Sequence, residues 1–197
     1  MRQNKKYYKY TNYHKEPGGL RKLDFIVKSL ENYFASQDKS KIRILDFGCG
    51  KGNISWPLAS IGYNVLGIDV DKNSIEFINK KNRFKNARFE VKDIINMRKD
   101  LMFDCIIASE VIEHLTNPAG FLRQVKRRLK AGGIFIVSIP YGYSLEEMIR
   151  RFSTHTKIGN SIKKMLKDLF LSKEELIQTA VESPHLHFFT LKKFKSM

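Results

Sequence analysis

The fold is decided by residues 44–53, which read Ile44-Leu45-Asp46-Phe47-Gly48-Cys49-Gly50-Lys51-Gly52-Asn53. An apolar run contains a carboxylate near its end, and three glycines then alternate with other residues before a helical pattern begins. Glycine suits such a turn because a side chain there would collide with a ligand lying across the backbone. A dinucleotide fingerprint would need glycine at position 53, and a phosphate-binding loop would need Ser or Thr after Lys51. The stretch therefore predicts a ligand-binding glycine turn of another kind.

Short apolar runs and helical patterns alternate on either side of this turn. The five candidate strands are residues 42–47, 64–68, 87–91, 103–108 and 134–139. The helical candidates are residues 20–34, 54–61, 72–81 and 119–129. Such alternation indicates an α/β fold with a doubly wound, mostly parallel sheet that helices cover on both faces.

Composition places the chain among single soluble domains. It has 197 residues, of which 42% are hydrophobic and 28% charged, so disorder and fibrous repeats have no support. We find no secretory signal and no apolar run long enough to cross a bilayer, and we therefore expect a cytoplasmic protein. Cys49 and Cys105 lie in apolar contexts without metal-type spacing, which indicates reduced, buried thiols.

The net charge of +16 is large for a chain of this length. Such a charge favours contact with nucleic acid or with an anionic membrane surface. The lysines are spread along the whole chain, however, and a solvated basic surface explains them equally well. The sequence leaves these alternatives open.

Acidic residues also follow the next two predicted strands. Asp69 comes directly after residues 64–68, and its carboxylate can accept two hydrogen bonds from ribose hydroxyls. Asp93 follows residues 87–91 closely. The carboxyl ends of parallel strands meet at one edge of a sheet, where a crevice opens at the point of strand-order reversal. One elongated, nucleoside-like ligand can touch all of these residues.

Five motifs in order resemble those of class I S-adenosylmethionine-dependent methyltransferases, which have a Rossmann-like fold. They are the glycine turn, the acidic ends of two strands, the run 103–115, and the glycine turn with its strand at 130–140. The resemblance implies S-adenosylmethionine as the cofactor. It implies these cofactor-binding residues: Asp46, Gly48, Cys49, Gly50, Gly52, Asp69, Val70, Asp93, Ile94, Ser109 and Glu110.

Within that set the resemblance suggests individual roles. Asp93 resembles the residue that accepts the adenine amino group, and Ile94 would offer its backbone N–H to the ring. The backbone near Ser109 and Glu110 would receive the methionine ammonium group. The resemblance covers roughly residues 41–194.

A hydroxyl acceptor would need a general base besides alignment of the acceptor, methyl and sulfur atoms. His114 is the leading candidate because its loop follows the fourth strand on the crevice side. Glu113 would orient His114 or cap the coming helix. Weaker candidates are His155, His185 and His187. The motifs favour an oxygen of a small molecule or glycan as the acceptor.

Two alternatives differ from this interpretation. The first is an RNA 2′-O-methyltransferase, because Glu110, Glu113, His114 and His185 resemble the divalent-metal site of small-RNA 3′-terminal methyltransferases. The same motifs resemble metal-free relatives, including sugar and quinone-precursor O-methyltransferases, and we expect no metal. The second is a non-catalytic nucleotide-binding module that has kept the fold.

Three regions are expected along the chain. Residues 1–41 form an N-terminal helical segment or lid, and 42–140 form the S-adenosylmethionine-binding core. Residues 141–197 form an acceptor-side helical insertion, centred on 145–181, and a truncated C-terminal part. A complete domain of this class carries two more strands after the fifth, and this pair is expected to be missing here. The fifth strand would then have an unpaired edge, unless the region from 145 onward protects it.

Overall fold

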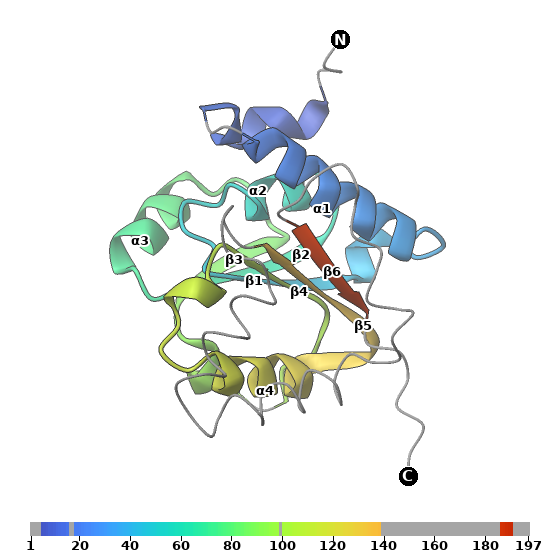
Figure 1. Cartoon of the computed structure of the whole chain (residues 1–197). Helices are drawn as coiled ribbons and strands as arrows, with labels where there is room; N and C mark the ends of the chain where they lie inside the picture. The colour runs from blue at the N-terminus through green and yellow to red at the C-terminus, as the bar shows by residue number, and fades with distance from the viewer. Residues whose placement is uncertain (1–4, 16–17, 99, 139–185, 191–197) are drawn as a thin grey trace.

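The strands form one central sheet in the computed structural model, which describes residues 5–15, 18–98, 100–138 and 186–190 (Figure 1). The sheet has six strands in the order β3-β2-β1-β4-β5-β6. Neighbours among the first five are parallel, and β6 is antiparallel to β5. The strands are β1 (Arg43–Phe47), β2 (Asn64–Asp69), β3 (Ala87–Val91), β4 (Phe103–Ser109), β5 (Leu129–Ser138) and β6 (Leu186–Thr190).

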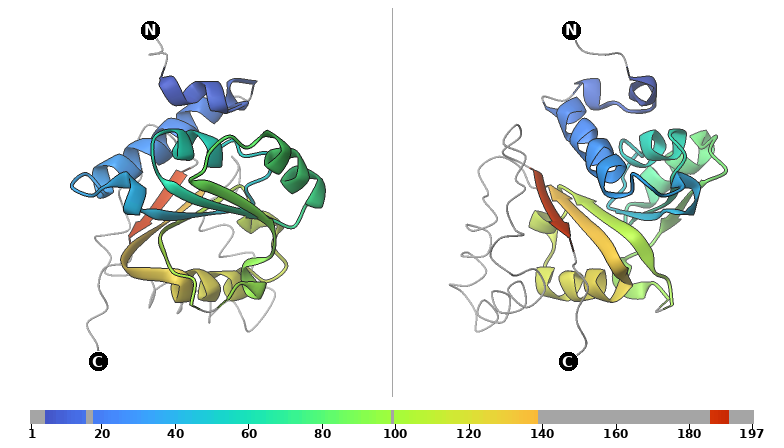
Figure 2. Two further views of the ribbon diagram at one scale, coloured as in Figure 1. Left: turned by 180° about the vertical axis from the view of Figure 1, so that it is seen from behind. Right: turned by 90° about the vertical axis from the view of Figure 1, so that its right-hand side faces the viewer.

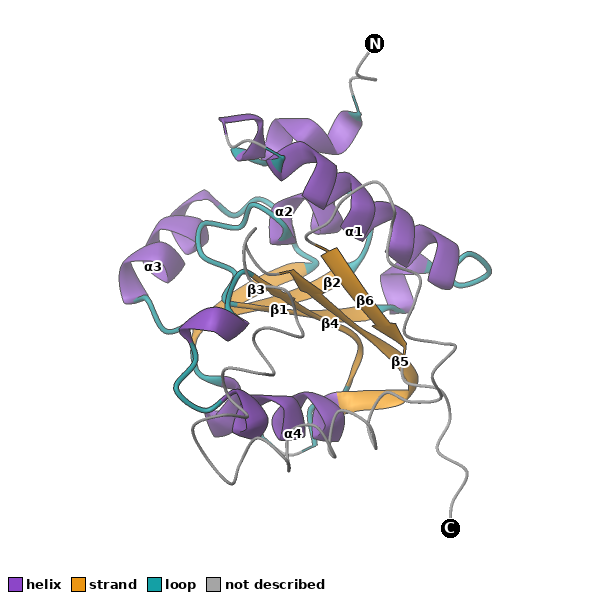
Figure 3. Ribbon diagram, in the orientation of Figure 1, coloured by secondary structure: helices purple, strands orange, loops and turns teal. Residues whose placement is uncertain are grey.

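Helices cover both faces of this sheet, which gives the molecule three layers (Figures 2 and 3). Helices α1 (Gly19–Tyr33), α2 (Ser55–Ser60) and α3 (Lys72–Lys81) lie on one face, and α4 (Pro118–Arg128) lies on the other. Each face of the sheet has its own cluster of buried apolar side chains, because the helices packed on that face bury their apolar sides against it. The doubly wound, mostly parallel α/β fold predicted from the sequence is confirmed.

Local sequence sets the helix ends. Asp71 caps α3 by accepting hydrogen bonds from the backbone N–H groups of Asn73 and Ser74. Asn117 caps α4 in the same way through the N–H of Gly120. Such caps satisfy donors that have no partner inside the helix. None of the helices in the described parts of the chain is long and apolar enough to span a membrane.

The N-terminal segment packs on the α1–α2 side of the molecule (Figure 1). It contains the short 3-10 helices Lys6–Tyr10 and Tyr13–Lys15. The hydroxyls of Tyr7 and Tyr8 donate hydrogen bonds of 2.7 and 2.6 Å to the Asp24 carboxylate in α1. These bonds, together with the buried ring of Tyr7, attach the segment to the domain.

Two features at the far side of the sheet differ from the expected elements. Strand β5 begins at Leu129 instead of residue 134, because a register shift between Phe103 and Cys105 lets the chain pair with β4 on both sides of the glycine turn. The edge of β5 is paired: Ile134 lies opposite Thr190 and Ser138 opposite Leu186. Strand β6 belongs to the region after residue 145, so the described residues agree with the alternative in which that region protects the edge. The insertion predicted at 145–181, which contains His155, lies outside the described residues.

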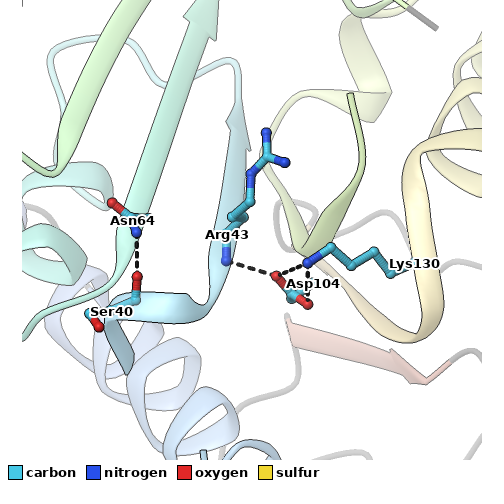
Figure 4. Close-up of polar contacts among 5 residues, drawn as sticks. All are labelled: Ser40, Arg43, Asn64, Asp104 and Lys130. Carbon is cyan, nitrogen blue, oxygen red and sulfur yellow. Dashed lines mark hydrogen bonds and ion pairs between the residues drawn. The ribbon is translucent and has the colours of Figure 1, made fainter. Parts of the chain in front are cut away.

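Polar contacts of Asp104 hold the amino ends of three strands together (Figure 4). The Asp104 carboxylate accepts hydrogen bonds from the Arg43 backbone N–H at 2.9 Å and from Lys130 Nζ at 2.8 and 2.9 Å. Nearby, the Asn64 side-chain amide donates to the Ser40 carbonyl. These contacts connect β1, β4 and β5 at their amino ends, and the candidate site lies at the opposite, carboxyl ends of the strands. The carboxyl ends of the strands carry the residues with candidate roles in binding.

Candidate cofactor and catalytic site

The candidate site lies where the strand order reverses, between β1 and β4. From β1 the chain proceeds to β2 and β3 on one side, and it then returns to place β4 on the other side. The loops that follow β1 and β4 meet here, since a Cβ atom on Gly48 would lie 2.4 Å from a methyl group of Val111. Open α/β sheets bind their ligands at such reversal points.

The three glycines of the turn have different surroundings. Gly48, Gly50 and Gly52 all have positive φ angles, of 71°, 49° and 82°. Gly52 packs against α3, because a Cβ atom there would lie 2.4 Å from Ile78 Cδ1. A Cβ atom on Gly50 would have no described atom within 4 Å. Gly48 and Gly52 thus allow close packing, whereas Gly50 presents bare backbone to open space, as a ligand lying across the turn requires.

Asp69 connects β2 to the glycine turn. One oxygen of its carboxylate accepts a hydrogen bond of 2.8 Å from the Gly50 backbone N–H, and the other accepts one of 2.9 Å from Asp71 N–H. The acid at the end of β2 and the turn after β1 therefore lie in direct contact, as one nucleoside-binding surface requires. Asp71 itself caps α3 and has a structural role.

Asp46 is enclosed in the protein beneath the turn. It is buried on β1, and its carboxylate accepts a hydrogen bond of 2.5 Å from Ser55 Oγ at the start of α2. Burial raises its pKa to about 7, the Ser55 hydrogen bond opposes this shift, and the negative charge of Asp69 adds to it. Asp46 holds α2 against β1 and thereby positions the turn from below. Ser55 was not singled out from the sequence.

The turn also contains Cys49, which is buried and has no disulfide partner. Burial raises the pKa of its thiol, and the nearby carboxylates of Asp46 and Asp69 add to the effect. The group therefore stays protonated and packs as a small apolar residue.

The ends of β2 and β3 provide the outer part of the candidate site. Strand β3 continues beside β2, where Lys92 N–H donates to the Asp69 carbonyl at 2.9 Å. The Asp93 carboxylate caps a short 3-10 helix, Ile94–Asn96, through Ile95 N–H at 3.1 Å. The Ile94 side chain is buried in the core on the α4 side, whereas Val70 is 71% exposed. An exposed apolar side chain after β2 provides a surface on which a flat ring can rest.

The loop after β4 is strained at Glu110, the one described non-glycine residue with a positive φ, 56°. Its backbone N–H donates to the Ser138 carbonyl at 2.8 Å, and the Ser109 and Ser138 hydroxyls are 2.7 Å apart. The Glu110 carboxylate accepts a hydrogen bond of 2.8 Å from Lys22 Nζ in α1. Sequence reasoning missed Lys22, because no local pattern links a helical lysine to so distant a loop.

Glu113 and His114 lie in the next turn, the 3-10 helix Ile112–His114, in contrasting environments. The side chain of Glu113 is 11% exposed and that of His114 is 77% exposed. His114 Nε2 and Glu113 Oε1 are 4.0 Å apart, which is too long for a hydrogen bond. Within the described residues neither oxygen of Glu113 accepts a hydrogen bond, and burial raises its pKa.

The alternative metal site is only partly described. Glu110, Glu113 and His114 lie in one loop, but the Glu110 carboxylate is bonded to Lys22. Within the part of the chain that the structure describes, no three His, Cys, Asp or Glu side chains are placed so that they could hold a metal ion together. His185 is outside the described residues, and only the backbone of His187 is described, in β6.

Comparison with known proteins agrees with this architecture. Residues 38–185 match the model of a family described as a methyltransferase domain, and the chain belongs to that family. The Rossmann-like fold of the chain is the fold of class I S-adenosylmethionine-dependent methyltransferases, to which this domain family belongs.

A relative from Rickettsia typhi, named ubiquinone biosynthesis O-methyltransferase, is 36% identical over 120 residues, which are 59% of this chain and 48% of the relative. The chain spans about half the length of the curated relatives it matches.

Two solved structures share the fold over most of the chain. The plantazolicin methyltransferase BpumL superposes with a TM-score of 0.64 at 19% identity, covering 92% of this chain and 88% of that protein. Magnesium protoporphyrin IX methyltransferase from Synechocystis PCC 6803 gives 0.63 at 16% identity, covering 93% and 85%. At such identities the likeness concerns the fold alone.

Proposed function

We propose that this protein transfers a methyl group from S-adenosylmethionine to an oxygen atom of a small-molecule acceptor. The observation that carries the proposal is the contact between Asp69 and Gly50, which unites the glycine turn with the acid of the neighbouring strand. The acceptor class rests on the relatives named ubiquinone biosynthesis O-methyltransferase, which are O-methyltransferases by name.

The residues of the site fit an adenosyl ligand. Gly50 offers bare backbone, Asp69 offers carboxylate oxygens to ribose hydroxyls, and Asp93 lies at the adjacent strand end, where it would accept from the adenine amino group. Val70 would rest against the ring, and the backbone at Ser109 and Glu110 would receive the ammonium group. Asp46, Gly48, Cys49, Gly52 and Ile94 support this surface from within.

S-adenosylmethionine supplies a methyl group already activated on a sulfonium, so the protein has to align the acceptor and remove its proton. We assign the proton transfer to Glu113. Burial raises the pKa of its carboxyl group, which makes the carboxylate a stronger base, and within the described residues no donor competes for its oxygens. His114 is exposed to solvent and would serve at most as a relay from Glu113 to water.

Calorimetric titration with S-adenosylmethionine and S-adenosylhomocysteine tests the binding part of this proposal. Asp69→Ala removes the acceptor of two charge-assisted hydrogen bonds, each worth about 1.5–3 kcal/mol, and should weaken binding at least about 100-fold. The matched control is Asp71→Ala, two positions away, which loses a helix cap and about 1 kcal/mol of stability but should bind the cofactor normally.

A folded protein that gives neither heat nor thermal stabilisation with either compound would overturn the proposal. Equal losses in the two variants would remove the assigned role of Asp69. A radiometric screen of phenols, sugars and short RNA, with the labelled donor, then identifies the acceptor class. Transfer to RNA alone would contradict the small-molecule assignment.

A further inference from the structure

A hollow of about 530 Å³ lies between the N-terminal segment and the end of α3. It shares no residue with the candidate cofactor site, although Trp56 in its wall adjoins Gly52. We call it the basic–aromatic groove. Its volume is in the range of small-molecule sites. It is lined by Lys9, Tyr10, Thr11, Asn12, Trp56, Lys80, Lys81, Asn82, Arg83 and Phe84.

Three aromatic side chains from separate segments meet in the groove. Tyr10 and Phe84 pack edge to face, with ring centroids 5.0 Å apart and an interplanar angle of 78°. Trp56 joins them from the first turn of α2. All three are partly exposed, so their rings remain accessible from the hollow. The Trp56 indole N–H itself is buried and finds no acceptor among the described residues, so it is the ring, not this N–H, that faces a ligand.

The same groove is strongly basic. Lys9, Lys80, Lys81 and Arg83 are exposed, and within the described parts of the chain none of them forms an ion pair with an acid. No acidic residue occurs between Glu76 and Glu90, while Lys85 and Arg88 continue the positive charge past the groove. Lys80 and Lys81 lie in the last turn of α3, where positive charges interact favourably with the helix dipole. That interaction does not account for the positive charges of Lys9 and Arg83, which lie outside the helix.

We propose that the basic–aromatic groove binds a nucleotide, with the base stacked on the aromatic rings and the phosphate near Lys80 and Arg83. Every base has a flat face that can stack on an aromatic ring, and cations beside the rings attract the phosphate. A membrane-binding surface would present protruding apolar side chains, whereas these rings are recessed in a hollow. The chemistry is shared by free nucleotides and single-stranded nucleic acid, and the two sources can be separated by experiment.

Trp56 provides a direct readout because it is the only tryptophan in the chain. Its fluorescence is followed while uridine monophosphate or a short oligouridylate is added. The protein is first saturated with S-adenosylhomocysteine, so that an adenosyl site is filled and the uracil compounds report on the groove alone. We expect saturable quenching, with an affinity for the oligouridylate that falls as salt is raised.

The variant Lys80→Glu/Arg83→Glu should weaken binding at least about tenfold, since two phosphate-facing cations become anions. The control Arg123→Glu/Arg127→Glu makes the same change of charge on exposed positions of α4, at the other face of the sheet, and should bind normally. Tyr10→Leu should weaken binding about 5- to 150-fold by removing a stacking surface for the base. Thermal melts check that each variant is folded.

Saturable quenching by the monophosphate assigns the groove to free nucleotides, and quenching by the oligouridylate alone assigns it to single-stranded nucleic acid. The proposal is overturned if neither compound quenches Trp56 in the folded protein. It is equally overturned if the two double variants lose affinity alike, because binding then follows net charge. Quenching by vesicles containing phosphatidylglycerol, but not by either uracil compound, would reassign the surface to membrane contact.

Discussion

Glu113 and His114 are neighbours in sequence whose exposed fractions, 11% and 77%, give them different chemistry. A base shielded from water transfers protons directly to and from a bound acceptor, whereas an exposed imidazole exchanges with solvent. We expect Glu113→Gln to lower kcat by about two to four orders of magnitude, and His114→Gln to lower it less than about tenfold. Because burial raises the pKa of Glu113, the wild-type rate should fall on the acid side of a pKa above the ordinary glutamate range.

Initial rates against pH, with an acceptor found in the screen, measure both effects. Calorimetry with S-adenosylhomocysteine serves as the control, because neither substitution should change cofactor affinity. A larger loss in His114→Gln would return the role of base to His114.

Asp46 makes stability depend on pH. Its pKa is raised to about 7 by burial, against about 3.9 in an unfolded chain. Between these values the native protein holds a proton that the unfolded chain has lost, so the contribution of Asp46 to the free energy of unfolding falls as pH rises from about 4 to 7. Above about pH 7 both states are ionised and its contribution is constant.

Asp46→Asn should abolish this slope, and relative to wild type it should gain up to about 4 kcal/mol between pH 4 and pH 8. Urea unfolding at several pH values measures the gain. Asp38→Asn is the control: Ser40 hydrogen bonds lower the pKa of Asp38, so that residue is ionised in both states above about pH 5 and adds no slope there. A slope that persists in Asp46→Asn would show that the carboxyl is ionised in the folded protein.

Helix α1 and the loop after β4 are joined through Lys22 and Glu110, which are 2.8 Å apart. Lys22 Nζ also lies 4.7 Å from the centre of the Tyr13 ring, so one buried lysine holds both the loop and the N-terminal segment. We expect Lys22→Met to cost about 1–2 kcal/mol in the free energy of unfolding, and to speed amide exchange in both segments. Lys72→Met, which breaks an exposed pair with Glu76, should change neither. Equal exchange in both variants would contradict the link.

The periodic elements could be predicted from the sequence, and the long-range contacts could not. The apolar stripe of α1 and the buried runs of β1 to β4 have the spacings of a helix and of parallel strands. Pairing of Lys22 with Glu110 depends on how α1 packs over the sheet, which no local pattern records. The early start of β5 depends on a bulge, and pairing of β6 joins positions far apart in the chain. The contact of Ser55 with Asp46 could have been anticipated, because Ser55 is a hydroxyl residue at the start of the helix that follows the glycine turn.

Across the whole molecule, the candidate site is assembled from segments that are far apart in sequence. Four segments gather at the carboxyl ends of the strands: the turn after β1, the acids after β2 and β3, and the loop after β4. At the amino ends, Asp104 holds neighbouring strands together through its hydrogen bonds. Motif order along the chain predicted this gathering. It could not distinguish an enclosed acid, Asp46, from one at the glycine turn, Asp69, because that difference arises from the helices packed around each strand.

On the ribosome, β1 to β5 emerge in numerical order, and β5 is complete once Ser138 has been translated. Its outer edge pairs with Leu186–Thr190, which are synthesised only after a long intervening stretch. The nascent domain thus passes through a stage with an open row of backbone donors and acceptors, to which another strand can add. A translation product that stalls in that interval would associate with a second copy or require a chaperone.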